Sequence, residues 1–158
     1  MRLWHYKLIP YLPKSQLLAQ WRELNSIFKR QDKHILINYI YEYPKNDLYT
    51  YTIMVTQEMI KRGYKIKTRD NFYNYFGVDA TTYLEMVETP FKNHHDFEYL
   101  QICYYNLKEK YMRHQKDFSK ELFNDLENFY NEEYLEDIKR NCIIVDLKKR
   151  RKKWEHTQ

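Results

Sequence analysis

Residues 15–28, SQLLAQWRELNSIF, carry the helical pattern on which the expected fold is built. The apolar residues recur at the 3.6-residue spacing of an α-helix and fall within one half of its circumference. The spacing predicts an amphipathic helix that begins at Lys14 or Ser15, ends near Lys29 and turns this stripe toward the core. The stripe consists of Leu17, Leu18, Trp21, Leu24, Ile27 and Phe28.

Two neighbouring charged residues, Arg22 and Glu23, lie in the middle of this stretch. Neighbouring residues on a helix do not face each other, so the two do not form an ordinary helical ion pair. Instead they fall on opposite flanks of the apolar stripe, where each can reach the rim of whatever packs against the helix. Taken by itself, Glu23 is either a solvated helix glutamate or a carboxylate aimed into a cleft, and the residues alone favour the solvated interpretation.

The composition favours one helical domain. A chain of 158 residues suits a single core, and its 17 Tyr, 8 Phe and 3 Trp supply much apolar area. Only 2 Gly and 4 Pro occur, so hairpin turns that need positive φ would be hard to build. The expected fold class is therefore all-α, rather than a sandwich or a barrel.

Further elements are expected on both sides of the first helix. Residues 1–13 contain two prolines and are expected to be extended or irregular. The apolar run 35–43 is expected to be a short strand or a buried connector, and residues 64–79 a loop. The remaining expected helices cover 47–62, ending before Gly63 as an αL cap, then 80–88, 96 to about 114, and about 118–139.

The two later helices also show helical spacing of apolar residues, which predicts a buried face on each. The residues are Tyr99, Leu100, Cys103, Leu107 and Tyr111 on one helix, and Leu122, Phe123, Leu126, Phe129, Tyr130 and Ile138 on the other.

Charge is distributed unevenly along the chain, whose net charge is +5. Residues 1–34 are basic, residues 116–140 are acidic, and residues 148–153 read KKRRKK. We expect a helical domain over residues 1–147 and a basic, disordered tail over residues 148–158. A polarised basic surface suggests a polyanionic partner, nucleic acid first, while a solvated surface with a solubilising tail is an equally open interpretation.

The sequence lacks the motifs of several classes of enzyme and metal-binding protein. The chain has no Gly-rich phosphate loop, no HExxH, no GxSxG and no Cys/His cluster with zinc spacing, so no metal or cofactor is expected. His94 and His95 are interpreted as surface histidines, and Cys103 and Cys142 as reduced thiols of a cytoplasmic protein. No run is long and apolar enough for a membrane span or a secretory signal.

The segment from Gln16 to Phe28, with LxAxxREL at its centre, resembles the first helix of the pyrimidine-dimer DNA glycosylases. The likeness extends from residue 1 to Lys33-His34, and EMIKRGYKIK at 58–67 is similar to the end of that family's central helix. The opening MRLWHYKLIPYLP and the stretch 94–110 resemble a bacterial branch of the superfamily. The resemblance covers roughly residues 1–110.

The resemblance implies a compact all-helical domain with its N-terminal segment packed between helices. It also implies a DNA repair glycosylase with AP lyase activity that acts through an imine on the N-terminal amine. On this sequence the catalytic residues would be Met1, which bears the amine, and Glu23, which would stabilise the developing sugar cation and move protons. A free α-amine has a pKa of about 7.7–8.0, so a useful fraction is unprotonated at neutral pH.

The same resemblance implies damaged double-stranded DNA as the partner. Arg22 would hold a phosphate, and Arg2, Lys33 and His34 would add contacts to the DNA backbone that do not depend on sequence. The phage branch of the family has a small residue at position 2, so that its initiator methionine is removed. Here residue 2 is Arg, and Met1 is expected to be kept.

Three functions therefore stay open. The first is the glycosylase/AP lyase, and the second is a non-catalytic helical protein that binds nucleic acid through its basic surfaces. The third is a protein-interaction module that uses the acidic helix over residues 117–137.

Overall fold

The computed structural model describes residues 1–155, with side chains described as far as Lys152, and this part of the chain is helical without a strand. The expected all-α, single-domain fold is confirmed. In chain order the elements are η1 (Tyr6–Tyr11), α1 (Lys14–Arg30), η2 (Asn38–Glu42), α2 (Lys45–Lys61), α3 (Asp70–Phe76), α4 (Phe97–Met112) and α5 (Lys120–Glu155).

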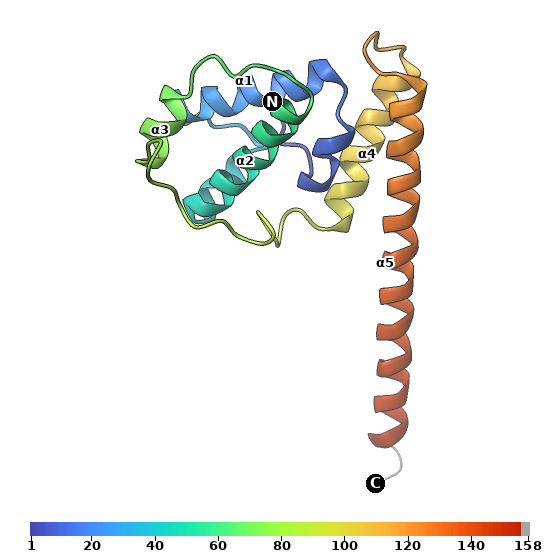
Figure 1. Ribbon diagram of the computed structural model, residues 1–158. Helices are drawn as coiled ribbons and strands as arrows, with labels where there is room; N and C mark the ends of the chain where they lie inside the picture. Colours follow the sequence, from blue (N-terminus) through green and yellow to red (C-terminus); the bar gives the residue numbers. More distant parts are fainter. Residues whose placement is uncertain (156–158) are drawn as a thin grey trace.

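The helices form two groups that meet at the N-terminal segment (Figure 1). Helix α1 packs against α2 and α3, and α4 packs against α5. The 3₁₀-helix η1 contacts α2, α4 and α5, so the start of the chain lies between the two groups. Leu3 and Leu8 are fully buried there. Helix α5 runs along α4 and then continues well beyond the rest of the molecule (Figure 1).

Helix α1 forms as its sequence pattern predicts. Leu17, Leu24 and Ile27 are fully buried, whereas Leu18 and Trp21 lie at the partly buried edge of the core. The helix ends at Arg30, and the cap residue Gln31 adopts the left-handed conformation. Lys29 and Arg30 lie in the last turn, where their positive charges are favoured by the helix dipole.

Helix α3 lies where a loop was expected. Phe72 and Phe76 are one helical turn apart, and both pack edge-on against Phe28 of α1, with ring centroids 6.0 and 5.3 Å from it. Gly77 then ends the helix at φ +64°, a left-handed conformation that favours glycine. Residues 70–76 thus form a short amphipathic helix with its aromatic face on α1 and a glycine cap. The prediction of a loop over 64–79 was wrong for this part.

The short helix expected over residues 80–88 is absent, because this segment bonds to its neighbours instead. Asp79 accepts hydrogen bonds from the backbone of Thr81 and Thr82, forming a turn at the start. Farther on, Val87 N donates to Thr50 Oγ1 and Asn46 Nδ2 donates to the Glu85 carbonyl, which lays the segment along α2.

The segments that flank α1 are also more helical than expected. Residues within 35–43 form the 3₁₀-helix η2 rather than a strand, and residues within 1–13 form η1. Pro10 is tolerated in η1 because so short a helix makes few internal hydrogen bonds. Gly63 follows α2 at φ +79°, which confirms it as a left-handed cap.

Helix α5 is longer than the expected helix over 118–139, and it continues through the segment expected to be a disordered tail as far as Glu155. No glycine or proline interrupts it, lysine and arginine are good helix formers, and Arg150 pairs with Asp146 one turn earlier at 3.2 Å. Ile138 is 40% exposed, so its predicted place on the buried face was wrong. Residues 156–158 of the expected tail lie outside the described residues.

The packing of α1 makes a stability prediction. Leu24→Ala removes a fully buried side chain and leaves a cavity, so we expect it to lower the free energy of unfolding by about 2–5 kcal/mol. The matched control is Leu18→Ala on the same helix, whose partly buried side chain should cost clearly less. Urea denaturation of the two variants measures the difference, and equal losses would show that the helix face is assigned wrongly.

Candidate functional site

A buried glutamine of α1 fixes the start of the chain. Gln20 is 1% exposed, and its Oε1 accepts a hydrogen bond from Trp4 N at 2.9 Å. Its Nε2 donates to the Arg2 carbonyl at 3.2 Å, so one side chain pairs with the backbone of two residues of the N-terminal segment. Tyr51 of α2 donates to the same Oε1 at 2.9 Å and holds the amide in place.

Two tyrosines bind the N-terminal backbone as well. The Tyr51 hydroxyl is within 2.8 Å of the Trp4 carbonyl, and the Tyr99 hydroxyl of α4 donates to the Leu3 carbonyl. A free chain end normally frays, but here side chains from three helices position residues 2–4. The N-terminal segment is thus packed between helices.

Glu23 faces this fixed chain start. Its Oε2 accepts from Arg2 N at 3.3 Å and from Gln20 Nε2 at 3.2 Å. Burial raises the pKa of the Glu23 carboxyl, and the rise is opposed by the Arg2 N–H and by the positive charge of the Met1 α-amine. Glu23 is therefore not a solvated helix glutamate but a half-buried carboxylate beside the chain start.

An open pocket of about 260 Å³ lies at this point. Both the chain start and Glu23 line it, and α4 closes its far side with Asn106 and Lys110. Met1 itself is 40% exposed, so the first residue of the chain is reached by solvent. The full lining is Met1, Arg2, Trp4, Gln16, Ala19, Gln20, Glu23, Leu36, Asn106 and Lys110.

The structure brings together only some of the site residues expected from the sequence. Met1, Arg2 and Glu23 share the pocket, whereas Arg22, Lys33 and His34 are exposed on α1 and the loop after it and do not line the pocket.

Arg2 acts on the interior as well as on the pocket. Burial raises the pKa of the Cys103 thiol, and the positive charge of Arg2 opposes this rise, so the guanidinium lies near this buried residue of α4. A guanidinium held there is less available to a DNA phosphate than one on the surface.

Among the pocket residues that the sequence did not point to, four have polar or charged side chains: Gln16, Gln20, Asn106 and Lys110. Gln20 had a detectable signal, because it lies three residues after Leu17 and four before Leu24, where an apolar residue would continue the stripe. A polar residue at such a core position must find hydrogen-bond partners. Gln16 lies one turn before Gln20, whereas Asn106 and Lys110 are far away in the sequence and reach the pocket only through the packing of α4.

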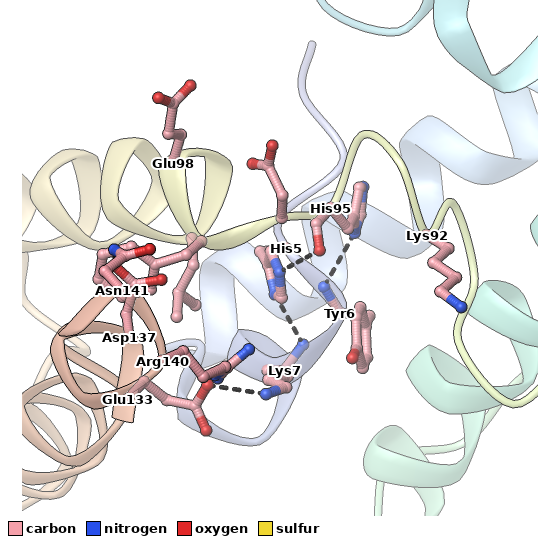
Figure 2. A pocket seen from close by; sticks show the side chains of 13 residues that line it. His5, Tyr6, Lys7, Lys92, His95, Glu98, Glu133, Asp137, Arg140 and Asn141 are labelled. Carbon is pink, nitrogen blue, oxygen red and sulfur yellow. Dashed lines mark hydrogen bonds and ion pairs between the residues drawn. The ribbon is translucent and has the colours of Figure 1, made fainter. Parts of the chain in front are cut away.

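A second group of polar side chains, shown in Figure 2, anchors the next residues of the chain. His5 Nε2 bonds the His95 carbonyl at 2.9 Å, while Lys7 N donates to His5 Nδ1. Tyr6 N donates to His95 Nδ1, and His95 Nε2 lies 2.7 Å from the Tyr39 hydroxyl. Because one ring nitrogen of each histidine accepts a backbone N–H, both rings bond as neutral tautomers.

Burial keeps these histidines uncharged. It lowers the pKa of His5 to about 4 and that of His95 to about 2. The interpretation of His95 as a surface residue was wrong, because the loop before α4 folds it inward to 4% exposure. His94 remains partly exposed and stacks on Tyr39, with ring centroids 3.6 Å apart.

His5 and His95 border a larger pocket of about 570 Å³ between η1, the start of α4 and the middle of α5. The ion pair between Lys7 and Glu133, 2.7 Å long, lies on its wall and joins the N-terminal segment to α5 (Figure 2). In the described part of the chain, no three His, Cys, Asp or Glu side chains gather where they could hold a metal ion. Its helices likewise include none that is long and apolar enough to cross a bilayer.

These features define a class of protein: a small helical domain that presents its N-terminus and a half-buried glutamate in one open pocket. Residues 1–72 of the chain match the model of the family described as pyrimidine dimer DNA glycosylase. The resemblance found in the sequence is confirmed over this range, which includes the chain start, α1 and α2. The closer likeness to a bacterial branch stays a prediction. No curated protein and no solved structure matches the chain.

The family match points to a function of the pyrimidine dimer DNA glycosylase type and supports DNA as the partner. The matched residues contain the N-terminal segment and Glu23, while Asn106 and Lys110 lie beyond them.

The neutral histidine pair makes the stability depend on pH. Both histidines have a lower pKa in the folded chain than the ordinary value of 6.5, so below pH 6.5 the unfolded chain binds more protons. Stability should therefore fall as the pH is lowered from 6.5 toward 4, by up to about 1.4 kcal/mol per pH unit for each histidine. Urea denaturation at several pH values checks this. His34→Gln removes an exposed histidine and should keep the slope, and a flat profile would contradict the neutral pair.

Proposed function

We propose that the protein is a glycosylase/AP lyase that acts on damaged DNA through an imine at its N-terminal amine. The observation that carries the proposal is the hydrogen bond of 3.3 Å between Glu23 Oε2 and the backbone nitrogen of residue 2, in an open pocket that Met1 also lines. The match of residues 1–72 to the pyrimidine dimer DNA glycosylase family supports the same reaction class.

In the proposed reaction the unprotonated Met1 α-amine attacks C1′ of the damaged nucleotide. The bond between C1′ and the base breaks, and the base leaves with the bonding electrons. The C1′–O4′ bond then breaks, O4′ takes up a proton, and loss of the amine protons gives an imine between C1′ and the Met1 nitrogen. Removal of a proton from C2′ then allows β-elimination, which breaks the C3′–O bond and cuts the strand. An α-amine is suited to this because its pKa lies near neutrality without large desolvation.

Glu23 would serve both halves of this reaction. Its carboxylate lies beside the chain start, where it can stabilise positive charge that develops on the sugar. Since burial raises the pKa of this carboxyl, Glu23 also gains a proton more readily than a solvated glutamate, which suits proton transfer to and from the sugar.

The Met1 amine is not the nitrogen that contacts Glu23. The nitrogen that bonds Glu23 belongs to Arg2, and the Met1 nitrogen lies one residue farther along the chain, displaced by at most about 3.6 Å. Catalysis is sensitive to displacements of about 1 Å, so the exposed Met1 must turn its amine back toward the sugar. Removal of Met1 would instead convert the Arg2 nitrogen into an amine already in contact with Glu23.

DNA would be held by basic side chains around the pocket. Arg22, Lys33 and His34 are exposed, free to reach phosphates, and located on the same helix as Glu23 or the loop after it. Lys110 lines the pocket opposite the chain start and is placed to meet a phosphate next to the damaged nucleotide.

A non-catalytic protein that binds nucleic acid on the same scaffold is the second candidate. It is favoured by Arg2, which moves the amine away from the position next to Glu23, and by the net charge of +5.

Trapping with borohydride on duplex DNA that contains an abasic site tests the enzyme directly. Borohydride reduces an imine to a stable amine, so the wild-type chain should become covalently attached to the DNA. Glu23→Gln keeps the size of the side chain but loses its charge, and we expect it to lower the trapping rate by about 100-fold or more. The matched control, Glu109→Gln on the exposed side of α4, should trap like the wild type.

Mass spectrometry of the trapped peptide then identifies the amine. A DNA adduct on Met1 supports the reaction as proposed, and one on residue 2 of a chain without Met1 moves the nucleophile to Arg2. Absence of an adduct, together with DNA binding that weakens with salt, would favour the second candidate.

Salt dependence of DNA binding tests the proposed phosphate contacts. Arg22→Ala and Lys33→Ala should each weaken binding to undamaged and damaged duplexes alike, and each should reduce the slope of log affinity against log salt by about 1. The matched control is Lys116→Ala, an exposed lysine in the turn before α5. Fluorescence anisotropy measures the slopes, and an unchanged slope would exclude the substituted residue from the DNA surface.

A further inference from the structure

The second half of α5 is a long helical segment whose side chains, as far as the structure describes them, are exposed. The buried residues of this helix, including Phe123, Leu126 and Tyr130, all occur in its first half. From Leu135 onward every described side chain is exposed except that of Asp137, and Figure 1 shows the helix leaving the body of the molecule. An isolated helical segment of this length is marginally stable in water, because most helical stability comes from packing of an apolar face.

This free segment nevertheless carries an apolar face. Leu135, Ile138, Cys142 and Val145 follow one another at intervals of three, four and three residues, the spacing of a two-helix coiled coil. The exposed fractions of Leu135, Ile138 and Val145 are 56, 40 and 51%. The stripe lies more than about 100° around the helix from the face that packs on the body, so the body cannot cover it.

The charges of α5 are separated along its length. Its first half carries acidic residues without an intervening lysine or arginine, and its far end carries KKRRKK. In a parallel pair of such helices, basic end would meet basic end. In an antiparallel pair, the basic end of each helix lies along the acidic half of the other. The acidic residues are Glu121, Asp125, Glu127, Glu132, Glu133, Glu136 and Asp137.

We propose that the occupant of this face is a second copy of the chain, paired with the first through an antiparallel α5–α5 contact. The pairing is isologous, so each stripe covers the other about a two-fold axis. It places Ile138 of each copy beside Cys142 of the other, and Leu135 beside Val145. The proposal is independent of the glycosylase function, because the stripe lies far along α5 from the pocket at the chain start.

The flanking charges agree with this register. Because Ile138 is level with Cys142, residue 132 of one copy is level with residue 148 of the other, so Glu132 lies near the basic residues Lys148 and Lys149. The same register also brings Tyr134 next to Lys148 of the other copy, where an ammonium group can lie on the aromatic ring. The apolar stripe therefore sets the alignment, and the separation of charge along α5 favours the antiparallel orientation.

Sedimentation velocity tests the dimer. The wild-type chain should sediment at twice the 20.0-kDa chain mass, and increasing salt should weaken the dimer because opposite charges are paired. Val145→Asp, in the stripe, should weaken dimerisation at least about tenfold. Ile144→Asp is the matched control, since Ile144 is the next residue, 47% exposed and on another side of the helix. Circular dichroism verifies that both variants remain helical.

Oxidative cross-linking tests the orientation. In the antiparallel register the two Cys142 residues are offset by about 6 Å along the helix axis, and the helices are also separated from each other. The two thiols are therefore too far apart for a disulfide. Ile138→Cys should instead give a dimer linked between residue 138 and Cys142 of the second copy, while Ile143→Cys should not. Cys103 is buried and does not compete.

Three results would overturn the proposal. They are a chain that stays monomeric at high concentration, an efficient disulfide between two Cys142 residues, which requires parallel helices, and equal loss of the dimer in Val145→Asp and Ile144→Asp. A monomer in which added duplex DNA protects residues 135–152 from amide exchange would assign this surface to nucleic acid instead.

Discussion

Gln20 is the residue on which the arrangement of the site depends. A primary amide offers two donors and an acceptor, and here it pairs with Trp4 N, the Arg2 carbonyl and Glu23. In a fully buried position an unpaired amide would be costly, so the N-terminal segment has to lie where it satisfies this side chain. The contact thereby sets the distance between the chain start and the Glu23 carboxylate.

The rest of the core repeats this way of holding backbone with side chains. Tyr51, Tyr99, His5 and His95 each bond a backbone group of the first seven residues or of the loop before α4. Among the described residues no buried side-chain nitrogen or oxygen lacks a hydrogen-bond partner. The high tyrosine content therefore has a structural use, because a tyrosine fills core volume and still delivers a hydroxyl to a backbone carbonyl.

The two ends of the chain differ in regular secondary structure and in anchoring to the rest of the protein. Residues 2–4 form no regular helix and yet are fixed, because buried donors and acceptors of three helices require their backbone. The second half of α5 is regular, and yet its side chains are exposed from Ile138 to Lys152, as far as they are described. Regular secondary structure and tertiary anchoring are thus separate properties here, and each end has one without the other.

The sequence by itself determined the elements whose signals are local. The apolar spacing of α1, the cap at Gly63 and the scarcity of glycine all predict helices, and such signals act within a few residues. The family resemblance placed Glu23 and the chain start in one site, but no periodicity within residues 15–28 could do so. Helix α3 was missed, although Phe72, Phe76 and Gly77 carried its pattern, because a short aromatic run does not distinguish a helix from a loop.

Only the tertiary structure decided which residues meet. It turned His95 inward, brought Lys110 and Asn106 from α4 to the pocket, and led the Arg2 charge toward Cys103. These residues lie about a hundred positions apart in the chain, and their contact follows from how whole helices pack, a long-range property that local spacing does not encode. The sequence therefore determined which helices form, and their packing decided which side chains share a pocket with the start of the chain.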